Sequence, residues 1–222
     1  MGVHRAPEEL KEKIFRGTLK LVKDGGMANF SFPKLSAETG ISAPTVYEYY
    51  ENKTALLESW FLTVDSEVAT LVEKILKSIP ANVSSPQKAN ELCWLLWIVY
   101  WRYLISDADR TIFYWSFYNS PYYTERVYKQ RVVFYKEFLS FVGAMDNRFS
   151  ISETHNVDML VANLLDSTVA SAVKVLKGEY ENNEITVNTV YKMAFQPVFS
   201  ALGISKDEKD IGGTAYDRKG TA

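Results

Sequence analysis

One short segment of the sequence carries the side chains whose types and spacing best fit a chemical task, the binding of nucleic acid. Tyr47 and Tyr49 supply phenolic hydroxyls, and Lys53 supplies an ammonium group, at spacings that suit the phosphates flanking a groove. Ala43 and Thr45 are smaller and lie nearer the start of the same predicted helix, where they would face base edges. The segment therefore predicts a helix that holds the DNA backbone with its larger side chains and selects sequence with its smaller ones.

That helix is short and has a clear beginning. Ser42 is a suitable N-cap, Pro44 is tolerated in the first turn, and the helix is expected to run to about Tyr50. Val46 and Tyr50 are four residues apart and share the face expected to be buried. A helix of this length cannot bury a core of its own, so its other side is available to enter a major groove.

A second short helix should precede it. Ser31 stands before Phe32-Pro33 as a hydroxyl N-cap, the helix is expected to run to Thr39, and Gly40 ends it. Two short helices separated by a brief turn are typical of a helix-turn-helix. From geometry alone, an ordinary corner between two helices of a helical protein is the alternative.

The order of residues in this region resembles the DNA-binding region of tetracycline-repressor (TetR) family regulators. The resemblance lies within the stretch from Ser31 to Leu57 and is carried by Gly40, Ile41, Ser42, Thr45, Val46, Tyr47, Tyr49, Tyr50, Lys53, Leu56 and Leu57. It implies a homodimer that binds a palindromic double-stranded DNA operator and releases it when a small molecule enters a larger C-terminal domain. The residues expected to contact DNA are Ser31, Lys34, Ser42, Ala43, Pro44, Thr45, Tyr47, Tyr49 and Lys53.

The rest of the chain has helical periodicity and no sustained alternation of apolar and polar residues, so an all-α fold is predicted. A first helix over 8–24 should end at Asp24-Gly25-Gly26. Further helices are expected at 53–79, 87–106, 108–118, 122–145, 153–177 and 185–202, the last one kinked or ended early by Pro197. The predicted domains are a DNA-binding domain over 1–53, a helical ligand-binding and dimerisation domain over 54–204 and a flexible tail over 205–222.

Aromatic residues cluster in the predicted C-terminal domain, where 17 of the 31 lie between Trp94 and Phe141. Trp94, Trp97 and Trp101 recur at three and four residues and share one helix face. A well-filled aromatic core is one interpretation, a pocket for a flat, apolar or cationic small molecule is the other, and both can hold together. The candidate ligand-binding residues are Trp94, Trp97, Tyr100, Trp101, Phe113, Phe117, Phe138 and Asp166.

The segment 153–177 has an apolar face broader than packing on one neighbour requires. Its apolar pairs recur at Leu160/Val161, Leu164/Leu165, Thr168/Val169 and Ala172/Val173. One side is therefore expected to pack on its own domain and the other on a partner subunit. Together with 185–202, which carries Val187, Val190, Ala194 and Val198, it would form a four-helix interface of a homodimer.

Composition limits the other classes of function. The 222 residues carry a net charge of −2, with 47% hydrophobic and 23% charged residues, which is typical of a globular chain. One cysteine, Cys93, and two histidines leave no set of metal ligands, and no spacing supplies a nucleophile with its base, so no enzyme, cofactor or metal site is expected.

Location and partners are also constrained. The first residues hold no apolar signal segment, and the run Leu92–Trp101 is too short to span a bilayer, so a cytoplasmic protein is expected. The remaining rival to a ligand-responsive regulator is a DNA-bound interaction protein whose C-terminal domain recruits a protein partner.

Overall fold

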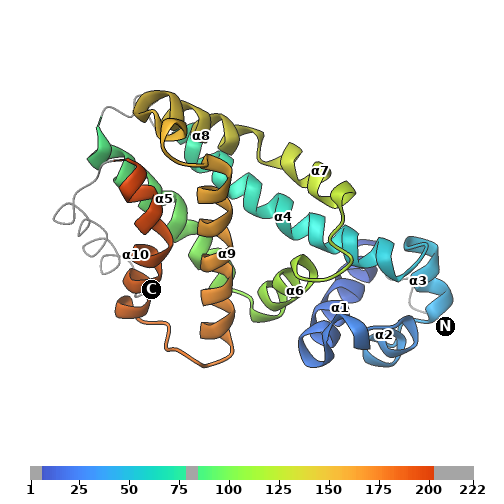
Figure 1. Ribbon diagram of the computed structural model, residues 1–222. Helices are drawn as coiled ribbons and strands as arrows, with labels where there is room; N and C mark the ends of the chain where they lie inside the picture. Colours follow the sequence, from blue (N-terminus) through green and yellow to red (C-terminus); the bar gives the residue numbers. More distant parts are fainter. Residues whose placement is uncertain (1–6, 79–84, 203–222) are drawn as a thin grey trace. The chain divides into compact units, whose positions relative to one another are not determined.

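The computed structural model describes residues 7–78 and 85–202, and in these ranges the chain is helical without a strand, which confirms the all-α prediction (Figure 1). The chain separates into two compact units. Unit 1 holds the residues up to Glu67 together with Asp107–Phe134, and unit 2 holds Val68–Ser106 together with the chain from Tyr135 onward. Compactness thus groups residues 107–134 with the N-terminal helices, whereas the predicted division by function falls at residue 53.

Unit 1 is built around the three N-terminal helices. Its helices are α1 (Pro7–Asn29), α2 (Phe32–Thr39), α3 (Ala43–Tyr49), the first part of α4 (Lys53–Ser78), α6 (Ala108–Tyr118) and α7 (Glu125–Phe134). Helix α1 packs against α2 and α6, and α2 packs against α3. The core contains Ile14, Leu19, Leu35, Val46 and Leu56, each fully buried. One side chain from each of these short helices is therefore enough to fix it to the unit.

Helix α1 is longer than the sequence predicts. It continues to Asn29 beyond the expected end at Asp24-Gly25-Gly26. Gly26 has a φ of 73° and a ψ of 171°, so the helix is interrupted there and a further turn follows. Only glycine adopts this conformation at low cost, which explains why the run Gly25-Gly26 marks a kink instead of an end.

Unit 2 contains the remainder of α4 and the C-terminal helices. These are α5 (Pro86–Ile105), α8 (Lys136–Phe149), the 3-10 helix η1 (Ile151–Glu153), α9 (Val157–Leu176) and α10 (Glu184–Ala201). Helices α5, α9 and α10 pack on one another, and α9 and α10 run side by side in Figure 1. Asn156 and Asn183 cap the last two helices by accepting hydrogen bonds from the backbone N–H groups of Met159 and Thr186.

Three predicted helices are corrected by the structure. The segment 122–145 is two helices, because Tyr135 has φ −94° and ψ 17° and separates α7 from α8. The helix expected from residue 153 begins at Val157, since Asn156 is its N-cap and the 3-10 helix precedes it. Helix α10 does not end at Pro197. Proline removes one N–H from the ladder, and so near the C-terminus of the helix this loss is tolerated.

Two further expectations lie outside the described residues. They are the end of the long helix at residue 79 and the flexible tail over 205–222.

Candidate nucleic-acid interface

Hydroxyl caps hold the two short helices in place. The Ser31 Oγ accepts from the backbone N–H of Lys34 at 3.4 Å, and the Ser42 Oγ accepts from the backbone N–H of Thr45 at 3.3 Å. The Ser42 and Thr45 hydroxyls also share a hydrogen bond of 2.8 Å. Both N-caps predicted from the sequence are confirmed.

The turn between the two helices depends on Gly40. Its φ is 67° and its ψ is 15°, in the left-handed region that favours glycine, and its N–H donates to the carbonyl of Ser36 at 2.8 Å. The next N–H, of Ile41, donates to the Thr39 Oγ1 at 3.2 Å. The turn therefore satisfies its own backbone groups and sends the chain directly into the Ser42 cap.

One face of α3 is buried, as the sequence predicts. Val46 is fully buried and Tyr50 is 9% exposed, its ring 5.9 Å from that of Trp60 on α4. Burial raises the pKa of the Tyr50 hydroxyl above its usual range. Trp60 in turn stacks on Phe15 of α1 at 4.4 Å. The recognition helix is thus fixed to both α1 and α4 through aromatic contacts.

The other face of α3 is open. Ser42, Pro44 and Glu48 are exposed, and Tyr47 is 57% exposed. The predicted contacts Ala43, Thr45 and Tyr49 are half-buried. The Tyr47 ring meets the Phe32 ring edge-on at 4.7 Å, which holds the phenol on α2 while its hydroxyl remains accessible. The first turn of α3 and Tyr47 therefore form an accessible surface of the kind that enters a groove.

The two predicted lysine contacts are engaged within unit 1. The exposed Lys34 donates to the Asn29 Oδ1. The half-buried Lys53 donates from Nζ to the Met27 carbonyl at 2.8 Å, and this nitrogen lies over the rings of Phe30 and Tyr122. No local sequence signal identifies Met27, Phe30 or Tyr122 as partners of Lys53, because only folding brings them together.

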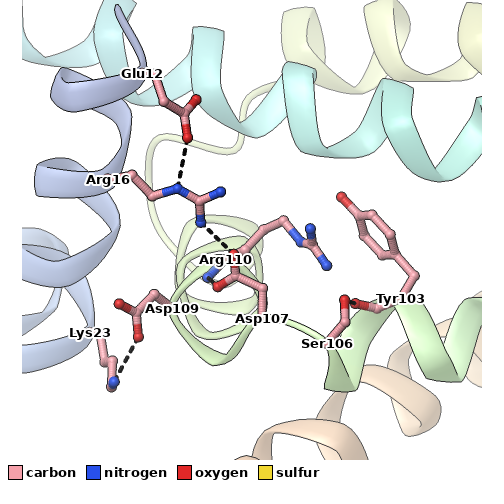
Figure 2. Close-up of polar contacts among 8 residues, drawn as sticks. All are labelled: Glu12, Arg16, Lys23, Tyr103, Ser106, Asp107, Asp109 and Arg110. Carbon is pink, nitrogen blue, oxygen red and sulfur yellow. Dashed lines mark hydrogen bonds and ion pairs between the residues drawn. The ribbon is translucent and has the colours of Figure 1, made fainter. Parts of the chain in front are cut away.

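Ion pairs join α1 to the start of α6 (Figure 2). Arg16 contacts Glu12 at 2.8 Å and Asp107 at 2.5 Å, and Lys23 contacts Asp109 at 2.6 Å. Burial favours the neutral form of Asp107, but hydrogen bonds from the Arg110 backbone and from Arg16 outweigh it and lower the pKa of this carboxyl. Asp107 is therefore both the N-cap of α6 and the anchor of α6 on α1.

A second polar cluster joins α4 to α6 and α7. The fully buried Asp65 accepts from the Tyr114 hydroxyl at 2.9 Å and pairs with the Arg131 Nε at 3.0 Å. Arg131 also donates to the Tyr114 hydroxyl at 2.8 Å. Two turns earlier on α4, Glu58 pairs with Arg126. These contacts make α4, α6 and the first part of the reading domain one connected framework.

The tryptophans proposed as ligand contacts lie together in unit 2. Trp94 and Trp97 are 5.6 Å apart, Trp97 and Trp101 are 5.5 Å apart, and Tyr191 of α10 contacts the first two rings. The Trp97 Nε1 donates to the Thr168 Oγ1 at 3.0 Å. These rings cover much of one another, so they serve as the core that joins α5, α9 and α10.

The structure does not bring all the predicted ligand contacts into this cluster. Phe113 and Phe117 are fully buried in unit 1, where Phe117 stacks on Phe61 at 4.5 Å. Tyr100 is buried on α5, whereas Phe138 on α8 and Asp166 on α9 are half-buried. The described residues contain no group of three histidine, cysteine, aspartate or glutamate side chains arranged to hold a metal.

Two capped helices, a left-handed glycine turn and an open first turn on the second helix define a helix-turn-helix DNA-binding regulator. Residues 14–59 match the family described as bacterial regulatory proteins, tetR family. An HTH-type transcriptional regulator of Haemophilus influenzae, itself uncharacterized, is 35% identical over 72 residues, which are 32% of this chain and 38% of that protein's length. The chain belongs to the TetR family.

Solved structures extend the likeness in fold to both units. A TetR family regulator from Marinobacter aquaeolei has a TM-score of 0.71 at 18% identity, over 86% of this chain and 95% of that one. The regulator FadR from Bacillus subtilis, solved in complex with stearoyl-CoA, has a TM-score of 0.61 at 12% identity, over 87% of this chain and 98% of that one. At these identities, the likeness concerns the fold alone.

Helix α9 is long and apolar enough to cross a membrane by length and composition, with a mean hydropathy of 1.5. A single helix of this kind is weak support for a membrane span, since helices that pack inside proteins satisfy the same criteria.

Proposed function

We propose that this protein is a transcriptional regulator, and specifically a repressor, that binds a palindromic DNA operator as a homodimer and releases it when a small apolar or aromatic molecule binds. The observation that carries the DNA-binding part is the capped, exposed first turn of α3, held by a buried opposite face. This arrangement presents Ser42, Ala43 and Thr45 to base edges and Tyr47 to phosphate.

Dimerisation through α9 and α10 is supported by what these helices leave uncovered. Only 28% of the apolar window of α9 is buried, and Met159 is 69% exposed. On α10, Ile185 is 78% exposed and Met193 is 69% exposed. By contrast, Val187, Val190 and Ala194 are buried, so they face the protein's own core and not a partner. Apolar surface of this kind on two adjacent helices fits a four-helix interface.

Selection of bound duplexes from a random library tests DNA binding. We expect an enriched motif with two-fold symmetry, whose half-site centres are about 34 Å apart, or somewhat farther if the DNA bends. Replacing Thr45 with alanine should change the preferred bases, whereas Tyr47→Ala should weaken binding to every sequence and reduce its salt dependence. Failure to enrich any motif at moderate salt would refute the proposal.

The effector is proposed to bind unit 2 beside the tryptophan cluster. The Trp101 side chain is 1% exposed, and its indole N–H is buried without a hydrogen-bond acceptor among the described residues. A buried donor of this kind is uncommon, and a ligand carbonyl or ether oxygen would satisfy it. Because FadR of Bacillus subtilis was solved with stearoyl-CoA, acyl compounds belong in a screen with aromatic and cationic ones.

Tryptophan fluorescence tests this part, because the rings themselves report binding. A true effector should change the emission and release the selected operator, and Trp101→Phe, which keeps an aromatic ring but lacks the N–H, should weaken binding of effectors that carry an oxygen acceptor. If the screen yields no such compound and a protein partner binds the DNA-bound form instead, the C-terminal unit recruits proteins.

A further inference from the structure

The ammonium group of Lys53 joins three segments of unit 1 that are distant in sequence. Its Nζ donates to the carbonyl of Met27 in the last turn of α1 at 2.8 Å. It lies 5.9 Å from the centre of the Phe30 ring, in the connection between α1 and α2, and 5.5 Å from the centre of the Tyr122 ring, between α6 and α7. Both distances fall in the range of cation–π attraction. Lys53 therefore fixes the start of α4 against the other helices of the reading domain.

Tyr122 is itself held by α6. Its backbone N–H donates to the Ser120 Oγ at 3.2 Å, and its ring stacks on Phe117 at 6.4 Å with an interplanar angle of 24°. Phe117 is fully buried and stacks on Phe61 of α4. The position of the Tyr122 ring is thus determined by α6, although the ring's cationic neighbour belongs to the DNA-reading end of the chain.

We infer that Tyr122 is a positioning residue for the recognition helix and acts through Lys53. Lys53 follows the C-cap of α3, Tyr50, by three residues, so a displacement of its side chain is transmitted to α3 through a short, capped connection. The Tyr122 ring and the Met27 carbonyl together hold the Lys53 ammonium inside the domain. Lys53 is then an internal brace and not a phosphate contact. The inference rests on the proposed DNA binding.

The test uses the full-length protein and the duplex selected by the wild type. Tyr122→Leu removes the aromatic face, Tyr122→Phe keeps it as the matched control, and Lys53→Met removes the charge. We expect Tyr122→Leu and Lys53→Met each to weaken operator binding by about 5- to 20-fold. Tyr122→Phe should bind like the wild type, and the double variant Lys53→Met/Tyr122→Leu should be little weaker than Lys53→Met alone.

Salt dependence separates a brace from a phosphate contact. A brace leaves the slope of log affinity against log salt unchanged in Lys53→Met. Loss of phosphate contacts lowers its magnitude by about 0.9 for each contact. A reduced slope, or additive effects in the double variant, would overturn the inference even if DNA binding is confirmed.

Hydrogen exchange of the DNA-free protein gives an independent readout. Tyr122→Leu and Lys53→Met should speed exchange of the amides of α3 and leave those of α9 unchanged, while Tyr122→Phe should match the wild type. Unchanged exchange in α3 would overturn the inference. If the wild type selects no DNA, the proposed function fails, and the exchange result still decides whether Tyr122 positions α3.

Discussion

At the scale of single residues, Asp107 combines two roles that a substitution can separate. Asn is as good an N-cap as Asp, so Asp107→Asn should keep the cap on α6 and lose the ion pair with Arg16. Because Arg16 is 55% exposed, the loss at neutral pH should be about 0.2–1 kcal/mol of the free energy of unfolding. Urea unfolding of the two proteins measures this difference.

The pH dependence of that difference identifies its origin. The pKa of Asp107 is lowered in the folded protein, so its charge stabilises the fold above the unfolded pKa of about 3.9, and this stabilisation is lost as the pH falls through the folded value. The stabilities of wild type and Asp107→Asn should therefore converge in acid. A difference that stays constant from neutral pH into acid would show that the charge is not responsible.

Cys93 makes a second prediction at this scale. It is 8% exposed, and burial raises the pKa of its thiol to about 12 from an ordinary value of 9.0. The reactive thiolate is thus about a thousandfold rarer at pH 8 than in an exposed cysteine. A disulfide reagent should label the native protein very slowly and the urea-unfolded protein quickly. Rapid native labelling would mean that α5 opens readily around this residue.

At the scale of elements, two ion pairs between α4 and α7 should differ in strength because their burial differs. Asp65 is fully buried and Arg131 is 15% exposed, whereas Glu58 pairs with an Arg126 that is 64% exposed. Asp65→Ala should reduce the free energy of unfolding by about 3 kcal/mol, since it leaves a largely buried guanidinium unpaired. Glu58→Gln, on the same pair of helices, should cost about 1 kcal/mol or less. Similar losses in the two variants, measured by urea unfolding, would contradict this view.

The sequence predicts elements well where their signals are local. Ser31, Ser42 and Gly40 act on backbone groups within four residues of themselves, so α2 and α3 could be placed almost to the residue. Tyr135 gives no comparable signal, because the break between α7 and α8 involves neither glycine nor proline. The Lys53 brace and the Asp65 cluster depend on contacts between distant segments. Residue type and spacing therefore suggested a phosphate ligand at Lys53, and only the fold revealed its internal partners.

At the scale of the whole molecule, two reading helices must act together for a palindrome to be recognised. Neither unit supplies a second copy of α3, so tight and specific binding requires a second chain. The uncovered apolar residues Met159, Ile185 and Met193 on α9 and α10 indicate where that chain docks. Loss of the dimer should therefore reduce DNA affinity without any change in the reading surface.

Met193→Glu tests this coupling with little risk to the fold. The side chain is 69% exposed, so the charge should change the stability of the isolated chain by about 0.5 kcal/mol or less. Buried between two subunits, the same carboxylate would be unpaired, and sedimentation should then show a species near the 25.3 kDa of one chain. Val133→Glu, at a 72% exposed site on α7, is the matched control and should remain dimeric. A Met193→Glu protein that stays dimeric and binds the operator like the wild type would place the interface on another surface.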